Sequence, residues 1–184
     1  GVVYTEALGP AAFIGRARVV PLRNMGAAIS PFNAFLILQG VETLALRMDR
    51  ICESTLKVAE FLKGHAKVAW VNYAGLPDHT DYPLVEKYMG GRASGILNFG
   101  VKSADGDGKA AGGRFQDALK LVTRLVNIGD SKSLACHPAS TTHRQLSPEE
   151  MKKAGVSEDM VRLSIGLEHI DDILADLDQA LAAV

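Results

Sequence analysis

One arginine in a predicted strand is the side chain best suited to bind a substrate. Arg162 lies between Val161 and Leu163 in an apolar run. Because side chains alternate along a strand, Arg162 and Ser164 should point away from the face that carries the apolar residues. A guanidinium in that position can hold a carboxylate through two parallel charge-assisted hydrogen bonds. Periodicity alone leaves a second interpretation open, a solvated arginine on an edge strand, since arginine is mostly exposed.

The segment 127–143, NIGDSKSLACHPASTTH, is the second part of the chain with chemically useful side chains. Asn127 by itself reads as a turn or strand-end amide. No metal site is predicted, because His137 and His143 flank a proline and a metal normally needs three or four ligands. Cys136 and His137 are sequence neighbours and point apart on an extended chain, so they do not favour nucleophilic catalysis. We expect an irregular loop whose hydroxyls and imidazoles bond to the backbone.

Two weaker motifs add no chemistry. The acidic run Asp105–Gly108 lacks the ligand spacing and the final glutamate of a calcium loop. Neither glycine-rich phosphate-binding motif occurs, so nothing indicates a nucleotide.

The motifs together resemble the C-terminal domain of the Cys/Met-metabolism family of pyridoxal-phosphate (PLP) enzymes, which have fold type I. The resemblance rests on segment 127–143 and on RLSIGLE at 162–168, while SPFNAFLILQGVETLAL at 30–46 is similar to the family's long interdomain helix. It extends from about Tyr4 to Leu181. In this family the arginine of the R-L-S-x-G-x-E motif binds the α-carboxylate of the amino-acid substrate, so the resemblance implies that role for Arg162.

The resemblance also implies roles for two neighbours of this arginine. It places Asn127 beside the same carboxylate, where related lyases usually carry serine. Asparagine at this position is typical of the O-acetylhomoserine sulfhydrylase branch. The loop around Thr142 would line the active site, with Thr142 supporting Arg162, whereas His137 and His143 are expected to be structural.

The cofactor lysine of the family has no counterpart here. The family binds PLP as a Schiff base in its N-terminal half, and none of the ten lysines of this chain lies in the S-x-T-K context. The resemblance therefore implies that this chain is half of an enzyme and carries no catalytic residue of its own. It assigns no cofactor-binding residues to this chain. We expect the chain to be inactive by itself. The start at Gly1, without methionine, also predicts a truncated chain.

For the complete enzyme the resemblance implies a transferase of methionine biosynthesis. Acetate on O-acetylhomoserine would be replaced by sulfide or methanethiol, giving homocysteine or methionine, in a homodimer or homotetramer. Two alternatives stay open. One is another branch of the family, a methionine γ-lyase or a cystathionine γ-synthase. The other is a non-catalytic binding or dimerisation module.

Composition predicts a packed globular protein and excludes several partners. Of 184 residues, 47% are hydrophobic and 22% charged, which favours a core over disorder. The net charge is −1 and no run of Lys or Arg offers a face to nucleic acid. The longest apolar stretch, Phe32–Leu38, is far short of the ~20 residues of a membrane span. Cys52 and Cys136 form no disulfide pattern, which favours the reducing cytoplasm.

A long helix is predicted over Pro31–Lys63. Ser30 is a favoured N-cap residue and proline is favoured at the first helical position. One continuous helix would be roughly 50 Å long at about 1.5 Å per residue, enough to link two domains. Its early part is apolar nearly all round, so we expect burial on more than one side. Gly40 could kink it.

The rest of the chain predicts an α/β or α+β sandwich, a small sheet with helices on one face. Residues 1–64 would be the end of the cofactor-domain region with the linking helix, and 65–184 the substrate-recognition domain. The predicted elements are strands at 67–73, 94–101, 125–128 and 161–165, a loop at 103–113, a capping-box helix from Ser147 to Gly155, and an amphipathic helix at 170–181.

Overall fold

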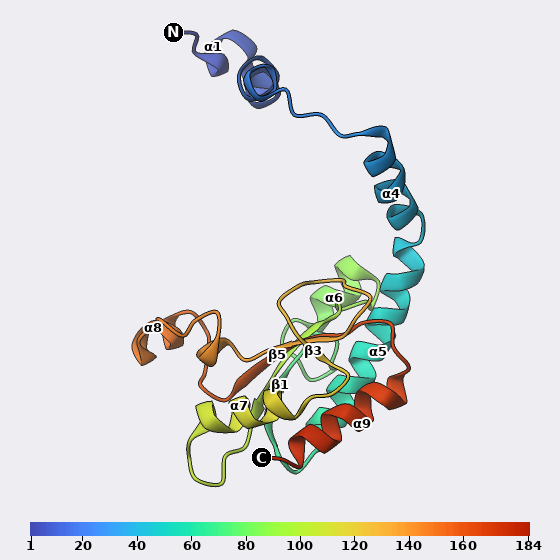
Figure 1. Ribbon diagram of the computed structural model, residues 1–184, viewed down its shortest axis with the longest axis vertical. Coiled ribbons are helices and arrows are strands. Elements are labelled where there is room, and N and C mark those ends of the chain that lie inside the picture. Colours follow the sequence, from blue (N-terminus) through green and yellow to red (C-terminus); the bar gives the residue numbers. More distant parts are fainter. The chain divides into compact units, whose positions relative to one another are not determined.

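The structure is a computed structural model that describes residues 1–184 (Figure 1). The chain divides into two compact units, Gly1–Thr43 and Leu44–Val184. The sheet and all buried residues belong to the second unit. The predicted division at residue 64 concerns the complete enzyme and stays a prediction; within this chain, the helix that follows Thr43 is part of the second unit.

The first unit is a series of short helical segments. They are α1 (Tyr4–Leu8), the 3-10 helix η1 (Gly9–Ala11), α2 (Ala12–Ala17), the π-helical turn η2 (Arg18–Leu22), α3 (Arg23–Met25) and α4 (Pro31–Glu42). Helix α4 begins as expected, because the Ser30 hydroxyl accepts a hydrogen bond from the Asn33 N–H at 3.2 Å.

The prediction of one helix over Pro31–Lys63 is wrong. Helix α4 ends at Glu42 and α5 spans Leu44–Gly64. The interruption lies at Thr43, with φ −100° and ψ 1°, and Gly40 remains helical. Threonine is a poor helix former because its β-branched side chain loses freedom against the preceding turn. No residue of α4 is buried, so packing does not offset this cost.

The predicted burial of the apolar stretch in α4 is also not found. Phe32 is 68% exposed and Leu38 58%, and no residue of the first unit is buried. A helix that is apolar all round needs cover on several sides, and the first unit provides none.

The second unit contains a five-stranded sheet in the order β1-β2-β5-β4-β3. All neighbouring strands are antiparallel except β3 and β4, which are parallel. The strands are β1 (Val68–Asn72), β2 (Ile96–Val101), β3 (Thr123–Arg124), β4 (Leu134–Cys136) and β5 (Met160–Ser164). The helices are α5, α6 (Tyr82–Met89), α7 (Gly108–Ala118), η3 (Pro138–Ser140), α8 (Pro148–Lys153) and α9 (Ile170–Leu181). The predicted fold class, a small sheet covered by helices, is confirmed.

The main core lies between one face of the sheet and helices α5, α7 and α9, of which α5 and α9 run side by side (Figure 1). Phe99 of β2 meets Phe115 of α7 edge to face at 5.4 Å, and both are fully buried. Leu163 of β5 belongs to this core, so Arg162 lies on the opposite face, as alternation predicts. The amphipathic helix at 170–181 is confirmed as α9.

The third predicted strand is misplaced. Residues 125–128 are exposed and belong to no strand, and the shorter β3 lies just before them. The fully buried β4 was not predicted at all. Its three residues carry no alternation, and their burial depends on their place between β5 and β3.

The predicted loop at 103–113 is wrong beyond Asp107, because α7 begins at Gly108. The Asp107 carboxylate accepts a hydrogen bond from the Ala110 N–H at 2.8 Å and caps the helix. A Cβ on Gly112 would come within 2.4 Å of His137 Nε2, so close packing selects glycine where propensity disfavours it. The capping box at Ser147 is confirmed, with both reciprocal hydrogen bonds present.

Candidate substrate-binding site

Arg162 lies in the middle of the sheet face opposite the core. Its direct neighbours across the sheet are Asn98 of β2 and Cys136 of β4. Directly opposite residues of antiparallel strands project on the same face. Arg162 and Asn98 are half-buried, whereas Cys136 is buried. Asn98, Arg162 and Cys136 thus form one row across the sheet, the row of Arg162. Its polar side chains can reach a molecule that lies on this face.

The guanidinium of Arg162 has almost no partner within the chain. Its Nη2 donates one hydrogen bond, to the backbone carbonyl of Asn127 at 3.4 Å, and it forms no ion pair. A guanidinium carries five N–H donors. Most of this donor capacity is free to bind a planar anion, as a carboxylate is.

Asn127 reaches Arg162 through its backbone, and its side chain shapes the loop that it begins. Asn127 Nδ2 donates to Asp130 at 3.0 Å, and Oδ1 accepts from the Ile128 N–H at 2.9 Å. Hydrogen bonds from the Lys132 N–H and then from Asn127 lower the pKa of Asp130. The structure thus brings Asn127 and Arg162 together, while a contact of the Asn127 amide with substrate stays a prediction.

Thr142 is exposed and does not contact Arg162. Its hydroxyl lies 2.9 Å from Nδ1 of His143. The neighbouring Thr141 is more closely tied to the site, because its hydroxyl lies 3.3 Å from Cys136 Sγ and donates to the His137 carbonyl at 2.8 Å. Support of Arg162 by Thr142 stays a prediction.

His137 is a core residue, as expected. It is fully buried, with Nδ1 2.8 Å from Ser140 Oγ and Nε2 2.8 Å from the Glu158 carbonyl. Its backbone N–H donates to Gln116 at 3.0 Å. Burial is the main cause that lowers its pKa. Both ring nitrogens of this neutral imidazole have hydrogen-bond partners, Ser140 and Glu158. The ring therefore links these two parts of the chain and is not available for acid–base chemistry.

Two residues of the RLSIGLE motif were assigned no role from the sequence. Ser164 lies on the same face as Arg162, and its hydroxyl is buried without a hydrogen-bond partner. Glu168 accepts two hydrogen bonds from Ser133, 35 positions earlier in the chain. Their places in the motif were the only signal, because the contacts that explain them are long-range.

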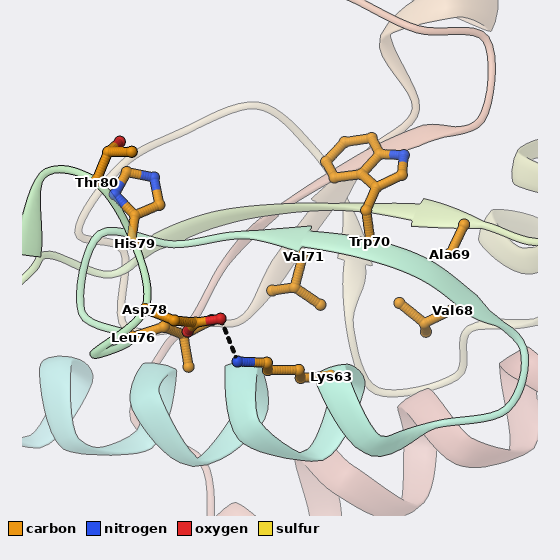
Figure 2. A pocket seen from close by; sticks show the side chains of 9 residues that line it. All are labelled: Lys63, Val68, Ala69, Trp70, Val71, Leu76, Asp78, His79 and Thr80. Atoms are coloured by element: carbon orange, nitrogen blue, oxygen red, sulfur yellow. Dashed lines mark hydrogen bonds and ion pairs between the residues drawn. The ribbon is translucent and has the colours of Figure 1, made fainter.

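A groove beside the outer strand β1 is a poor candidate for chemistry. Figure 2 shows Lys63 of α5 directed at Asp78, with which it forms an ion pair at 2.6 Å. His79 Nε2 lies 2.8 Å from Asn72 Oδ1. The polar side chains here bond to each other, and β2 separates β1 from the strand of Arg162.

The chain does not contain a PLP site of the lysine type. All ten lysines are exposed, and none lies in the row of Arg162. Lys57, for example, pairs with Glu53 on the same helix. The residues present are suited to bind a carboxylate and do not fit the Schiff-base end of a PLP cofactor. No three His, Cys, Asp or Glu side chains gather as metal ligands, and none of the helices has the length and apolarity to cross a membrane.

The fold and the arginine motif are those of a PLP-dependent enzyme: the chain belongs to the family described as Cys/Met metabolism PLP-dependent enzyme, whose profile matches residues 2–182. Among relatives, it is 51% identical over 182 residues to O-acetyl-L-homoserine sulfhydrylase 1 of Thermus thermophilus, covering 99% of this chain and 42% of that protein. It is 54% identical over 171 residues to O-acetyl-L-homoserine sulfhydrylase of Leptospira meyeri, covering 92% and 38%.

The fold of this chain is also similar to solved structures of proteins with the same kind of name. The fold is similar to an O-acetylhomoserine (thiol)-lyase of Campylobacter jejuni, with a TM-score of 0.82 and 43% identity over 95% of this chain and 40% of that one. That structure contains N'-pyridoxyl-lysine-5'-monophosphate. An O-acetylhomoserine sulfhydrylase of Wolinella succinogenes gives a TM-score of 0.73 and 37% identity, over 97% and 46%. The chain thus spans about two fifths of the length of these relatives.

Proposed function

We propose that this chain is the substrate-recognition part of a PLP-dependent O-acetylhomoserine sulfhydrylase. The complete enzyme would replace the acetate of O-acetylhomoserine by sulfide or methanethiol, giving homocysteine or methionine. One observation carries the proposal: Arg162 presents a nearly unpartnered guanidinium on the open sheet face, beside the Asn127 loop. The names of the relatives support the choice of substrate.

Arg162 orients the substrate in this proposal. Two parallel hydrogen bonds from its guanidinium would fix the α-carboxylate, while Nη2 also donates to the Asn127 carbonyl at 3.4 Å. A fixed carboxylate restricts rotation of the amino acid and so aligns its Cα–H bond. Arginine stays protonated and transfers no proton. PLP, held by the rest of the enzyme, supplies the electron sink.

The complete enzyme would be a homo-oligomer, a dimer or tetramer, in the cytoplasm. Both cysteines are buried free thiols, which suits a reducing compartment. We also expect this chain to be inactive by itself, because it has no buried lysine.

The first test is product analysis with the complete enzyme and four substrate sets. O-acetylhomoserine with sulfide should give homocysteine, and with methanethiol should give methionine. Methionine alone should give no α-ketobutyrate, and O-acetylhomoserine with cysteine should give no cystathionine. Release of α-ketobutyrate would favour a methionine γ-lyase, and formation of cystathionine a cystathionine γ-synthase.

The non-catalytic alternative is tested by calorimetry of this chain alone. Saturable binding of amino acids would support an independent binding module. We expect no such binding, because one arginine on an open face offers a ligand little enclosed surface.

A further inference from the structure

We propose that Glu168 is a positioning residue, which fixes the Asn127 loop relative to Arg162 and thereby sets the site for the substrate carboxylate. This inference rests on the proposed function. Glu168 does not contact the reacting atoms in this proposal. It acts through Ser133, at the far end of the loop that begins at Asn127.

The contact between Glu168 and Ser133 is bidentate and joins a half-buried carboxylate to a buried serine. Glu168 Oε1 accepts from the Ser133 N–H at 2.7 Å, and Oε2 accepts from the Ser133 hydroxyl at 2.8 Å. The same hydroxyl accepts from the Gly166 N–H at 2.9 Å. Ser133 is fully buried, so its N–H and hydroxyl depend on these partners, while its carbonyl accepts from the Thr123 N–H at 2.9 Å.

The backbone approaches closely at the same place. The Leu167 N–H donates to the Ser131 carbonyl at 2.9 Å. A Cβ on Gly166 would lie 2.5 Å from the carbonyl carbon of Lys132 and 2.6 Å from the Ser133 nitrogen. Only glycine permits this approach. Segment 131–133 is therefore joined to segment 166–168 by hydrogen bonds and by backbone contact.

These two segments belong to the two halves of the carboxylate site. Segment 166–168 begins two residues after the end of β5, which carries Arg162, and segment 131–133 begins four residues after Asn127. Between Leu125 and Lys132 the loop is exposed or half-buried, and its link to Arg162 is a single hydrogen bond of 3.4 Å. The contacts around Glu168 are thus more numerous and shorter than the one hydrogen bond that links the loop to Arg162.

A second carboxylate that binds backbone N–H groups, the buried Asp176, offers a control. Asp176 of α9 accepts from the N–H groups of Lys120, Leu121 and Val122, each at 2.9 Å. It holds the chain just before β3. The pairing of β3 with β4 lies between that point and Asn127, so Asp176 should affect stability and leave the carboxylate site in place.

The variants Glu168→Ala, Glu168→Gln and Asp176→Asn separate positioning from general stability. In the complete enzyme, with sulfide saturating, Glu168→Ala should raise KM for O-acetylhomoserine about tenfold with a smaller change in kcat, because it removes hydrogen bonds to a charged group that fix the loop. Glu168→Gln keeps an acceptor for the Ser133 N–H and should recover most of the affinity. Asp176→Asn should lower the Tm and leave KM within about twofold of wild type.

Amide hydrogen exchange gives a readout that does not depend on activity. Peptides covering 127–133 should exchange faster in Glu168→Ala than in Asp176→Asn. The proposal is overturned if Glu168→Ala leaves both KM and this exchange unchanged, or if Asp176→Asn raises KM as much. Should Glu168→Ala fail to fold, the same comparison is made with Ser133→Ala, which removes one of the two hydrogen bonds to Glu168 and also the acceptor for the Gly166 N–H.

The proposed function can fail independently. Wild-type enzyme without γ-replacement activity on O-acetylhomoserine would refute the function, while the exchange experiment would still test the contact. An active wild type with unaffected Glu168 variants would refute the positioning role alone.

Discussion

Arg162 and Asn127 are 35 positions apart and meet through one hydrogen bond, from Nη2 of the arginine to the backbone carbonyl of the asparagine. The bond uses the main chain of Asn127, so it does not depend on the amide. Arg162 keeps most of its donors, and Asn127 keeps its side chain for the turn that it forms with Asp130. Because the two side chains have different roles, mutation of each residue can test its contribution separately.

Replacement of Arg162 should weaken substrate binding in the complete enzyme. We expect Arg162→Ala to lower kcat/KM for O-acetylhomoserine about a hundredfold, through the loss of charge-assisted hydrogen bonds. Arg162→Lys should recover only part of this, because an ammonium cannot form the planar fork. Arg114→Ala, on the helix that covers the other face, is the control and should be unaffected. Unchanged steady-state kinetics in Arg162→Ala would refute the site.

Asn127 and Asp130 should contribute together to the shape of their loop. Asn127→Ala removes the bond to Asp130 and the acceptor for the Ile128 N–H, so KM should rise by several-fold. Asp130→Ala removes the same side-chain bond, and with it the acceptor for the Lys132 N–H, and leaves the amide of Asn127 in place. If Asn127 also touches the substrate, its variant should have clearly the larger KM in the same kinetic assay. Equal effects would limit Asn127 to shaping the turn.

His137 should make the fold less stable in acid. Because burial lowers its pKa below the usual 6.5, the unfolded chain binds the proton more readily than the folded chain. The stabilising contribution is present above about pH 6.5 and is lost as the pH falls through the folded pKa. Urea unfolding of this chain between pH 5 and pH 8 measures the effect. His137→Gln should unfold more easily at neutral pH and show a flatter dependence of stability on pH in this range; an unchanged dependence would contradict this role of His137.

Two adjacent glycines of α7 should respond in opposite ways to alanine. Gly112→Ala places a Cβ 2.4 Å from His137 Nε2 and should destabilise the fold by about 1–3 kcal/mol. The Cβ of Gly113→Ala would have no neighbouring atom within 4 Å, so this variant should stabilise the helix by roughly 0.5–1 kcal/mol. Thermal unfolding of the two variants checks both signs. A stabilising Gly112→Ala would mean that α7 does not pack on His137 as described.

The sequence by itself determined the parts of the fold that depend on short-range patterns. Apolar periodicity placed α9, the serine and glutamate of the capping box placed the start of α8, and alternation put Arg162 on the face away from the core. Each of these signals comes from side chains within a few residues, so it is visible before the chain folds. The resemblance of the arginine motif then supplied the family.

The tertiary structure alone decided the features that depend on distant neighbours. Strand β4 is too short and too uniformly buried to carry a pattern, and α7 begins in a glycine-rich stretch because Gly112 must fit against His137. The contacts of Glu168 and Asp176 span 35 and 54 to 56 positions. Buried carboxylates and backbone N–H groups must find partners wherever the fold brings them, and sequence distance does not encode that pairing.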